Sequence, residues 1–204
     1  MSNVYIKTKI RSGKTAMDYL GIYKNKTVYI VCDKFMAENG SQPAPAAAPT
    51  QFEIPKKARV AMLTALRKIE IKEFDIPEIS DDEMLVKVEG CGICGTDVHE
   101  YKNDPFGLIP VVLGHEGSGV IVKMGKNITM DTTGKPLTVG DRIVTCTIPC
   151  GHCDACLNMR DRDNLCENSG IYGLMPEDDH YHFNGWFSDY LVIRKGSTFF
   201  KVND

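Results

Sequence analysis

Four cysteines, at positions 150, 153, 156 and 166, constrain this chain more than any other feature of its sequence. Three of them form a regular CxxCxxC array, and nine residues separate the third from the fourth. Zinc prefers four tetrahedral thiolates, and tight CxxC turns can aim sulfur atoms at one point while a longer loop returns the last one. We therefore predict a closed structural zinc site formed by Cys150, Cys153, Cys156 and Cys166.

Other interpretations of this array stay open. Four cysteines can also hold an iron–sulfur cluster, or they can be free buried thiols. A disulfide framework fits less well, because five of the eight cysteines lie between Cys146 and Cys166 and no export signal is recognisable. His152 lies inside the array and is predicted to be a solvated loop residue, whereas Cys146 falls in an apolar pattern and is predicted to be a core thiol.

Composition limits the partners that such a chain can have. The 204 residues carry a net charge of −3 with well mixed signs, so no basic patch is available to neutralise nucleic-acid phosphates. No apolar run approaches the roughly 20 residues that span a bilayer, and residues 1–14 lack the apolar centre of a signal peptide. We expect a soluble cytoplasmic protein with no nucleic-acid or membrane partner.

The sequence divides into three predicted parts. Residues 1–39 indicate a short β-α-β fragment, and residues 40–55 form a linker rich in proline and alanine. In residues 56–204, short strand-like runs alternate with glycine and proline, which predicts a mainly β, barrel-like domain. Within it, residues 58–76 are predicted to form two strands joined by a turn, and residues 129–138 an exposed hairpin or loop.

A second set of potential metal ligands lies in GCGICGTDVHE, residues 90–100, and in GHE, residues 114–116. A closed four-thiolate site keeps no open position for a substrate, so chemistry must occur elsewhere. Cys94 and His115 can supply sulfur and nitrogen to a second zinc ion and still leave room for water or an alcohol. Cys91 also forms a CxxC pair with Cys94, which keeps a thiol redox function as an alternative.

These motifs, together with PVVLGHEGSGVI and VGDRIV, occur in the order typical of zinc-dependent medium-chain alcohol dehydrogenases. Residues from about 56 to 204 resemble the N-terminal catalytic domain of that family, which is a GroES-like barrel. The resemblance implies that Cys94 and His115 ligate a catalytic zinc ion, and that Glu116 sits behind the metal or ligates it directly. It also implies a small-molecule alcohol or polyol as substrate and NAD(P) as the hydride acceptor.

The same resemblance assigns roles to residues around the catalytic zinc. Thr96 would hydrogen-bond the substrate hydroxyl, and His99 would pass its proton towards solvent. Asp97 would orient His115 without touching the metal. Each residue has a simpler alternative, because Thr96 and Asp97 can cap the following helix and His99 can be a surface histidine.

The sequence also departs from the family pattern. Nine residues separate Cys156 from Cys166, where the family commonly has seven. The sequence ends at FFKVND, where family members continue towards a third zinc ligand and a nucleotide-binding domain, and no GxGxxG turn follows a strand. We therefore expect a domain incomplete at its C-terminus, with no cofactor-binding residue, that is inactive as an isolated chain.

Residues 1–39 resemble the start of iron-containing alcohol dehydrogenases but carry none of that family's iron ligands. They are interpreted as a docking element, a targeting element or a recombination relic. Homo-oligomers are an open alternative, because members of the zinc-dependent family are commonly dimers or tetramers. The leading hypothesis is a zinc-dependent alcohol or polyol dehydrogenase domain, and the alternative is a non-catalytic zinc-binding module.

Overall fold

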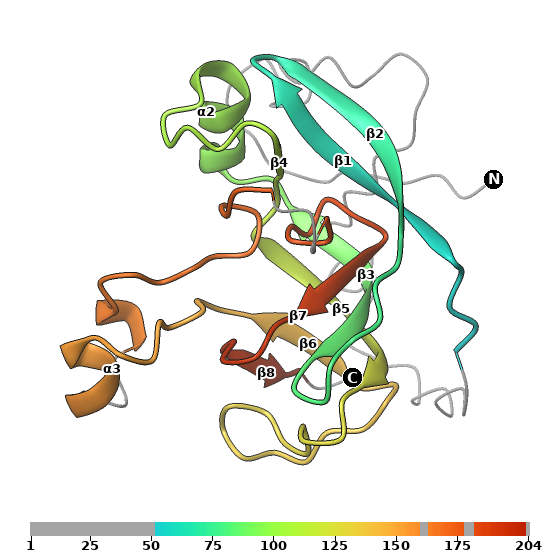
Figure 1. The fold of residues 1–204 in the computed structure, drawn as a ribbon, viewed down its shortest axis with the longest axis vertical. Helices are drawn as coiled ribbons and strands as arrows, with labels where there is room; N and C mark the ends of the chain where they lie inside the picture. The colour runs from blue at the N-terminus through green and yellow to red at the C-terminus, as the bar shows by residue number, and fades with distance from the viewer. Residues whose placement is uncertain (1–51, 160–162, 178–181, 203–204) are drawn as a thin grey trace, which may run out of the picture.

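The computed structural model describes residues 52–159, 163–177 and 182–202 (Figure 1). The predicted β-α-β fragment of residues 1–39 and most of the predicted linker of residues 40–55 lie outside the described residues. The described chain is mainly β, as the sequence predicts. No helix within it is both long and apolar enough to cross a membrane.

The first sheet has three antiparallel strands in the order β2-β1-β4. Strand β1 (Lys57–Ala65) leads through a tight turn into β2 (Lys68–Asp75), and β4 (Val111–Val112) pairs with the other edge of β1. Arg67 in the turn has a φ of 60°, in the left-handed region. The predicted pair of strands across residues 58–76 is confirmed.

The second sheet has five antiparallel strands in the order β7-β3-β5-β6-β8. Its long central ladder joins β3 to β5, and the loops at one end of this ladder carry residues with metal-ligand chemistry. The strands are β3 (Met84–Gly92), β5 (Glu116–Met124), β6 (Arg142–Thr145), β7 (Tyr190–Ile193) and β8 (Phe199–Lys201).

The two sheets meet along β1. An isolated bridge pairs Val60 with Ser188, and the Ala61 N–H donates a hydrogen bond to the Phe187 carbonyl oxygen at 2.8 Å. These contacts join the first sheet to the segment that precedes β7. The strand pairing among the described residues nevertheless gives two open sheets rather than one closed barrel.

Strand β3 is buried on both of its faces over its first three residues, Met84 to Val86. Met84 and Val86 belong to one apolar cluster together with Trp186, whereas Leu85 between them belongs to a second cluster with Val60. Successive strand residues point to opposite faces, so this one strand contributes to two cores. Full burial of each such side chain stabilises the fold by about 1.5–3 kcal/mol.

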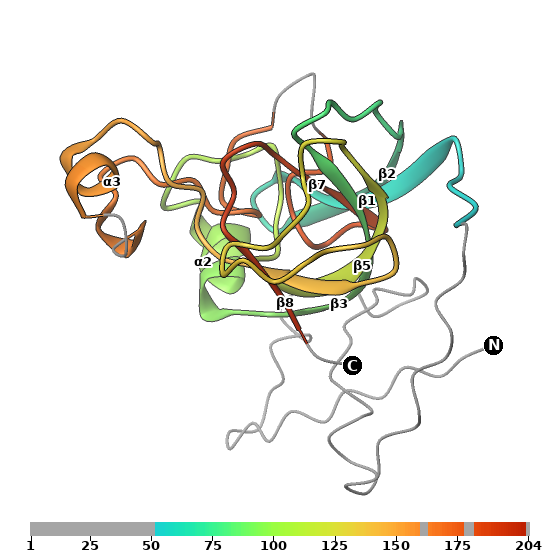
Figure 2. The ribbon, with the colours of Figure 1, turned by 90° about the horizontal axis from the view of Figure 1, so that it is seen from below.

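The helical elements lie between the strands. Helix α2 (Gly95–Asn103) directly follows β3, whereas α3 (Asp154–Asn158) and the 3-10 turn η3 (Asp163–Leu165) follow β6. In both ribbon views the segment around α3 projects away from the sheets (Figures 1 and 2). The described part of this projection, residues 150–159 and 163–166, is called the four-cysteine lobe.

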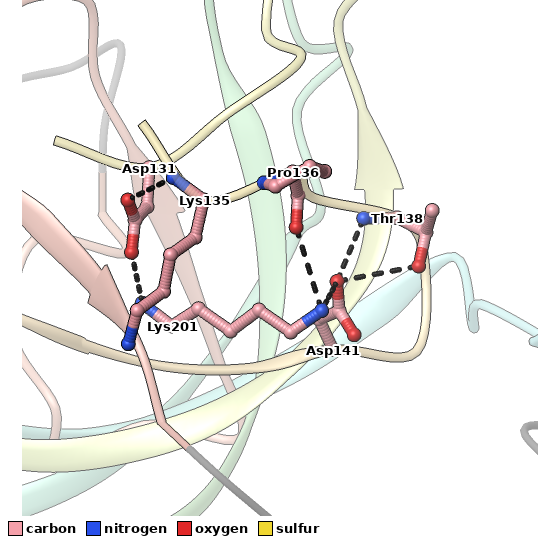
Figure 3. Close-up of polar contacts among 6 residues, drawn as sticks. All are labelled: Asp131, Lys135, Pro136, Thr138, Asp141 and Lys201. Atoms are coloured by element: carbon pink, nitrogen blue, oxygen red, sulfur yellow. Dashed lines mark hydrogen bonds and ion pairs between the residues drawn. The ribbon is translucent and has the colours of Figure 1, made fainter. Parts of the chain in front are cut away.

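The loop of residues 129–138 is tied to strand β8 by a buried carboxylate (Figure 3). Asp131 is only 4% exposed, and it accepts hydrogen bonds from the Thr133 hydroxyl and from three backbone N–H groups, one of them that of Lys201 in β8. The Lys201 ammonium group in turn lies 2.8 Å from the Asp141 carboxylate. The predicted loop is therefore anchored at its base rather than exposed throughout.

These hydrogen bonds keep Asp131 ionised. Burial alone would raise the pKa of Asp131, but the bonds from Lys201, Thr133 and Lys135 outweigh it and lower the pKa from 3.8 to about 2. A carboxylate whose pKa is depressed in the folded state stabilises the fold at every pH above its unfolded pKa. That contribution is lost as the pH falls from about 4 towards 2.

We expect Asp131→Ala to lower the free energy of unfolding at pH 7 by about 2–4 kcal/mol, because its donors lose a charged acceptor. Urea unfolding measures this loss, and the difference from the wild type should shrink between pH 4 and 2 as the wild-type carboxylate is protonated. Asp75→Ala, at the exposed end of β2, is the control and should change stability by less than about 0.5 kcal/mol. Equal losses in the two variants would contradict the anchoring role of Asp131.

Candidate metal centres

The four predicted cysteines lie together in the four-cysteine lobe. Cys153 is the N-cap residue of α3 and Cys156 lies within that helix, whereas Cys150 precedes the helix and Cys166 follows η3. The four Sγ atoms lie within 4.8 Å of one another. The Sγ atoms of Cys153 and Cys156 are 3.5 Å apart, and those of Cys150 and Cys156 are 3.9 Å apart. The distance between the Sγ atoms of Cys153 and Cys166 is also 3.9 Å.

These distances fit a single tetrahedral metal ion. A regular tetrahedron with metal–sulfur bonds of about 2.3 Å has sulfur–sulfur edges of about 3.8 Å. A disulfide would instead bring two sulfur atoms to about 2.05 Å, and a multi-iron cluster would place its own iron and sulfide ions between the cysteines. The donor set and its spacing therefore suit one zinc ion held by four thiolates.

Backbone N–H groups favour the thiolate form that zinc binds. The Cys150 N–H donates to the Cys166 Sγ at 3.2 Å, and this bond is the main cause of the lowered pKa of Cys166. The N–H of Cys156 contributes most to lowering the pKa of Cys153 to about 6. At Cys156 itself a backbone N–H also lowers the pKa, but desolvation and the neighbouring thiols outweigh it and raise the pKa to about 12.

One residue within the lobe and one just before it lie outside its set of four cysteine ligands. His152 is exposed, in agreement with its predicted loop position, and its Nδ1 lies 2.9 Å from the Cys150 carbonyl oxygen. Cys146, predicted to be a core thiol, is exposed instead. That prediction was wrong because β6 ends at Thr145, so the strand does not carry Cys146 into the core.

A second group of donors lies where β3 ends and β5 begins. Cys94 is the N-cap residue of α2, His115 directly precedes β5, and Glu116 is the first residue of β5. Their ligand atoms lie within 4.8 Å of one another. We call these three residues the open triad, because three protein donors leave one position of a tetrahedral site free for another molecule.

Asp97 supports the open triad from the buried side. Its carboxylate is 1% exposed and accepts hydrogen bonds from the N–H groups of Cys94, at 2.8 Å, and Gly114, at 3.1 Å. The same carboxylate lies 3.5 Å from Nδ1 of His115. Desolvation raises the pKa of Asp97, while the bond from Cys94 and the nearby His115 ring oppose this rise. A carboxylate in this position can fix the orientation of a metal-binding imidazole.

Thr96 and His99 lie on the first two turns of α2. The Thr96 Oγ1 lies 3.7 Å from the Cys94 Sγ, and His99 is exposed. Residues three apart on a helix are neighbours, so the hydroxyl and the imidazole belong to one face. The N-cap residue of α2 is Cys94, so Thr96 does not cap the helix. Asp97 closes the first turn through its bond to the Cys94 N–H.

A distant segment holds the loop that carries His115. The backbone N–H of Trp186 donates a hydrogen bond to the Gly114 carbonyl oxygen at 3.0 Å, and the Trp186 side chain is 1% exposed. Its indole lies directly over Gly117, where an added Cβ would come within 2.0 Å of the ring. The sequence predicts that Trp186 packs in the core, but no local pattern indicates its contacts with residues some 70 positions earlier.

A cavity of about 340 Å³ opens beside the open triad. His115 and Glu116 form part of its wall, together with Cys91, Ser118 and Thr145. A space of this size can admit a small polar molecule next to His115 and Glu116, whereas Cys94 does not line it. A larger hollow of about 560 Å³ lies along β1 and the segment before β7, and none of the predicted metal ligands lines it.

Residues 80–204 match the family described as the alcohol dehydrogenase GroES-like domain. The chain is also similar to sorbitol dehydrogenase of Bacillus subtilis (strain 168), with 33% identity over 151 residues. That match covers 72% of this chain and 39% of the relative.

Solved structures show the same relationship. Alcohol dehydrogenase from Thermotoga maritima matches with a TM-score of 0.65 and 33% identity, over 72% of this chain and 41% of that one. A protein of Sinorhizobium meliloti 1021, assigned as a zinc-binding dehydrogenase and solved bound to NADP, matches with a TM-score of 0.57 and 30% identity, over 73% and 39%. The chain thus spans about two fifths of the length of these proteins. These matches give no support to the predicted iron-type resemblance of residues 1–39.

Proposed function

We infer a function for this chain from the family to which it belongs, that of the alcohol dehydrogenase GroES-like domain. The proposed function is the zinc-dependent oxidation of an alcohol or polyol, with hydride transfer to NAD(P). The observation that carries this proposal is the open triad beside a cavity of about 340 Å³. The chain spans 39% of the length of its Bacillus subtilis relative, so the activity of a whole enzyme is itself part of the proposal.

Cys94, His115 and Glu116 would hold the catalytic zinc ion. Their sulfur, nitrogen and oxygen donors are ligand types that zinc accepts, and three protein ligands leave a fourth position for the substrate. When bound, zinc supplies Lewis acidity, which favours the alkoxide form of an alcohol. The cysteines of the four-cysteine lobe would hold a second, structural zinc ion.

Thr96 and His99 would carry the proton that the substrate hydroxyl loses. The Thr96 hydroxyl lies beside Cys94, where it can accept a hydrogen bond from an alcohol bound at the open triad. It can donate its own proton to the exposed imidazole of His99, which reaches solvent. Asp97 would keep His115 in its ligating orientation throughout.

Several wider expectations remain proposals. We propose that residues 1–204 alone bind zinc without oxidising alcohol, because no nucleotide-binding turn is recognisable in their sequence. We also propose that the chain divides into residues 1–39, 40–55 and 56–204, and that the first part has a docking or targeting role. A cytoplasmic location and a homo-oligomer are proposals as well.

Metal stoichiometry and dehydrogenase activity together test the proposed function. Elemental analysis of the native protein should find two zinc ions per chain. Reduced cofactor should form when the full native protein receives NAD⁺ or NADP⁺ with an alcohol or with sorbitol. A wild-type protein that contains only one zinc ion per chain and forms no reduced cofactor, with the same zinc content in His115→Ala, would contradict the proposal and favour the non-catalytic zinc-binding module.

A further inference from the structure

Gly92 occupies the position directly across the sheet from Glu116. The two residues are paired in the β3 and β5 ladder, at the end that carries the open triad. A Cβ added at Gly92 would lie 2.5 Å from the Glu116 Oε2 and 3.3 Å from its Cβ. Real Cβ atoms essentially never approach another heavy atom within 3.0 Å, so the Glu116 carboxylate occupies the space that any larger residue at position 92 would fill.

The need for glycine at position 92 comes from this space and not from backbone conformation. Several glycines in the chain have positive φ values, among them Gly114 at 93°, but Gly92 does not. An alanine could therefore adopt the same backbone without strain. The atom that would have to move most is the end of a flexible side chain, so the change should cost little folding free energy.

Nothing else in the described residues fixes the Glu116 carboxylate. Glu116 is exposed, and no hydrogen bond or ion pair of its side chain occurs within residues 52–159, 163–177 and 182–202. Its carboxylate oxygen nevertheless lies within 4.8 Å of the donor atoms of Cys94 and His115. The free space over Gly92 is thus what allows the carboxylate to lie beside the other two donors.

We propose that Gly92 is a positioning residue that keeps the Glu116 carboxylate available as the third protein donor of the open triad. This inference rests on the proposed function and adds a determinant of ligand geometry to it. A methyl group at position 92 would displace the carboxylate and leave Cys94 and His115 as the only protein donors in place. Metal bound at the open triad would then be held more weakly.

Exchange of Co²⁺ into the native protein tests this inference, because Co²⁺ bound by thiolate gives a visible spectrum. Cobalt at the open triad is identified as the equivalent that His115→Ala abolishes. Gly92→Ala should lower the affinity of the open triad for Co²⁺ by roughly tenfold or more and alter the visible bands of the bound ion. Gly95→Ala is the matched control: the glycine adjoins Cys94, but its added Cβ meets nothing within 4 Å. It should leave both quantities unchanged.

A double-mutant comparison separates positioning from a general structural effect. In a Glu116→Ala background, Gly92→Ala should cause no further loss of cobalt affinity, because the methyl group acts only through the carboxylate. An equal loss in both backgrounds, or an unchanged affinity and spectrum in the single variant, would overturn the inference and leave the proposed function standing. A wild type that binds cobalt only in the four-cysteine lobe would overturn both.

Discussion

The variant Cys153→Ala is expected to lose one zinc ion per chain, and its free energy of unfolding should be lower than that of the wild type by roughly 3–5 kcal/mol. Structural zinc contributes about 10–16 kcal/mol of apparent binding free energy in isolated zinc-finger domains, whose whole fold depends on it. We expect a smaller loss here because the lobe projects from sheets that have apolar cores of their own. Cys153 is buried, and its Sγ lies 3.5 Å from the Cys156 Sγ. A water molecule therefore cannot easily replace the missing thiolate as a zinc ligand. Elemental analysis and urea unfolding measure the two effects.

Cys146→Ser is the matched control for this variant. Cys146 is a free and exposed thiol just before the lobe, so its removal should change neither zinc content nor stability. Unchanged zinc in Cys153→Ala would show that the four cysteines do not form one site. A coloured wild-type protein that contains iron and no zinc would show that the array holds iron instead.

Under the proposed function, the variant Thr96→Ala should reduce the kcat of the full native protein by roughly 10²–10⁴-fold, and both proposed zinc ions should stay bound. The alanine removes the hydroxyl that would pass a proton from the substrate towards His99, but it leaves Cys94 and His115 in place. Steady-state kinetics with NAD⁺ or NADP⁺ measure the loss, and elemental analysis confirms the metal content.

Thr96→Ser provides the control, because serine keeps a hydroxyl at the same position and should retain most of the turnover. A Thr96→Ala enzyme with normal kcat would remove Thr96 from the proton path. A Thr96→Ala enzyme that has lost zinc would instead assign Thr96 to the support of Cys94, whose Sγ lies 3.7 Å away.

Local patterns in the sequence predict much of this fold. The paired strands across residues 58–76 follow from alternating apolar residues around a turn, which is a short-range signal. The way the strands join into sheets depends on long-range pairing, such as Val60 with Ser188, and no local pattern encodes it. For this reason the sequence indicates a mainly β domain but not its two open sheets.

The candidate sites divide in the same way. The spacing of the cysteines predicts their clustering in the lobe, and the motifs around Cys94 and His115 indicate a second group that the structure does bring together. Their ligand and catalytic roles stay predictions. Neither the space over Gly92 nor the hold of Trp186 on the His115 loop could be predicted, because both depend on contacts across the sheet or far along the chain.

The bond between Trp186 and the loop of His115 also has a consequence in time. Translation adds about 5–20 residues per second, so Trp186 leaves the ribosome roughly 4–14 s after His115. Until then the Gly114 carbonyl lacks the partner that it has in the folded protein. A nascent chain therefore carries the thiol of Cys94 and the ring of His115 for several seconds before their surroundings are complete. Metal delivered during synthesis meets these donors while they are still unassembled.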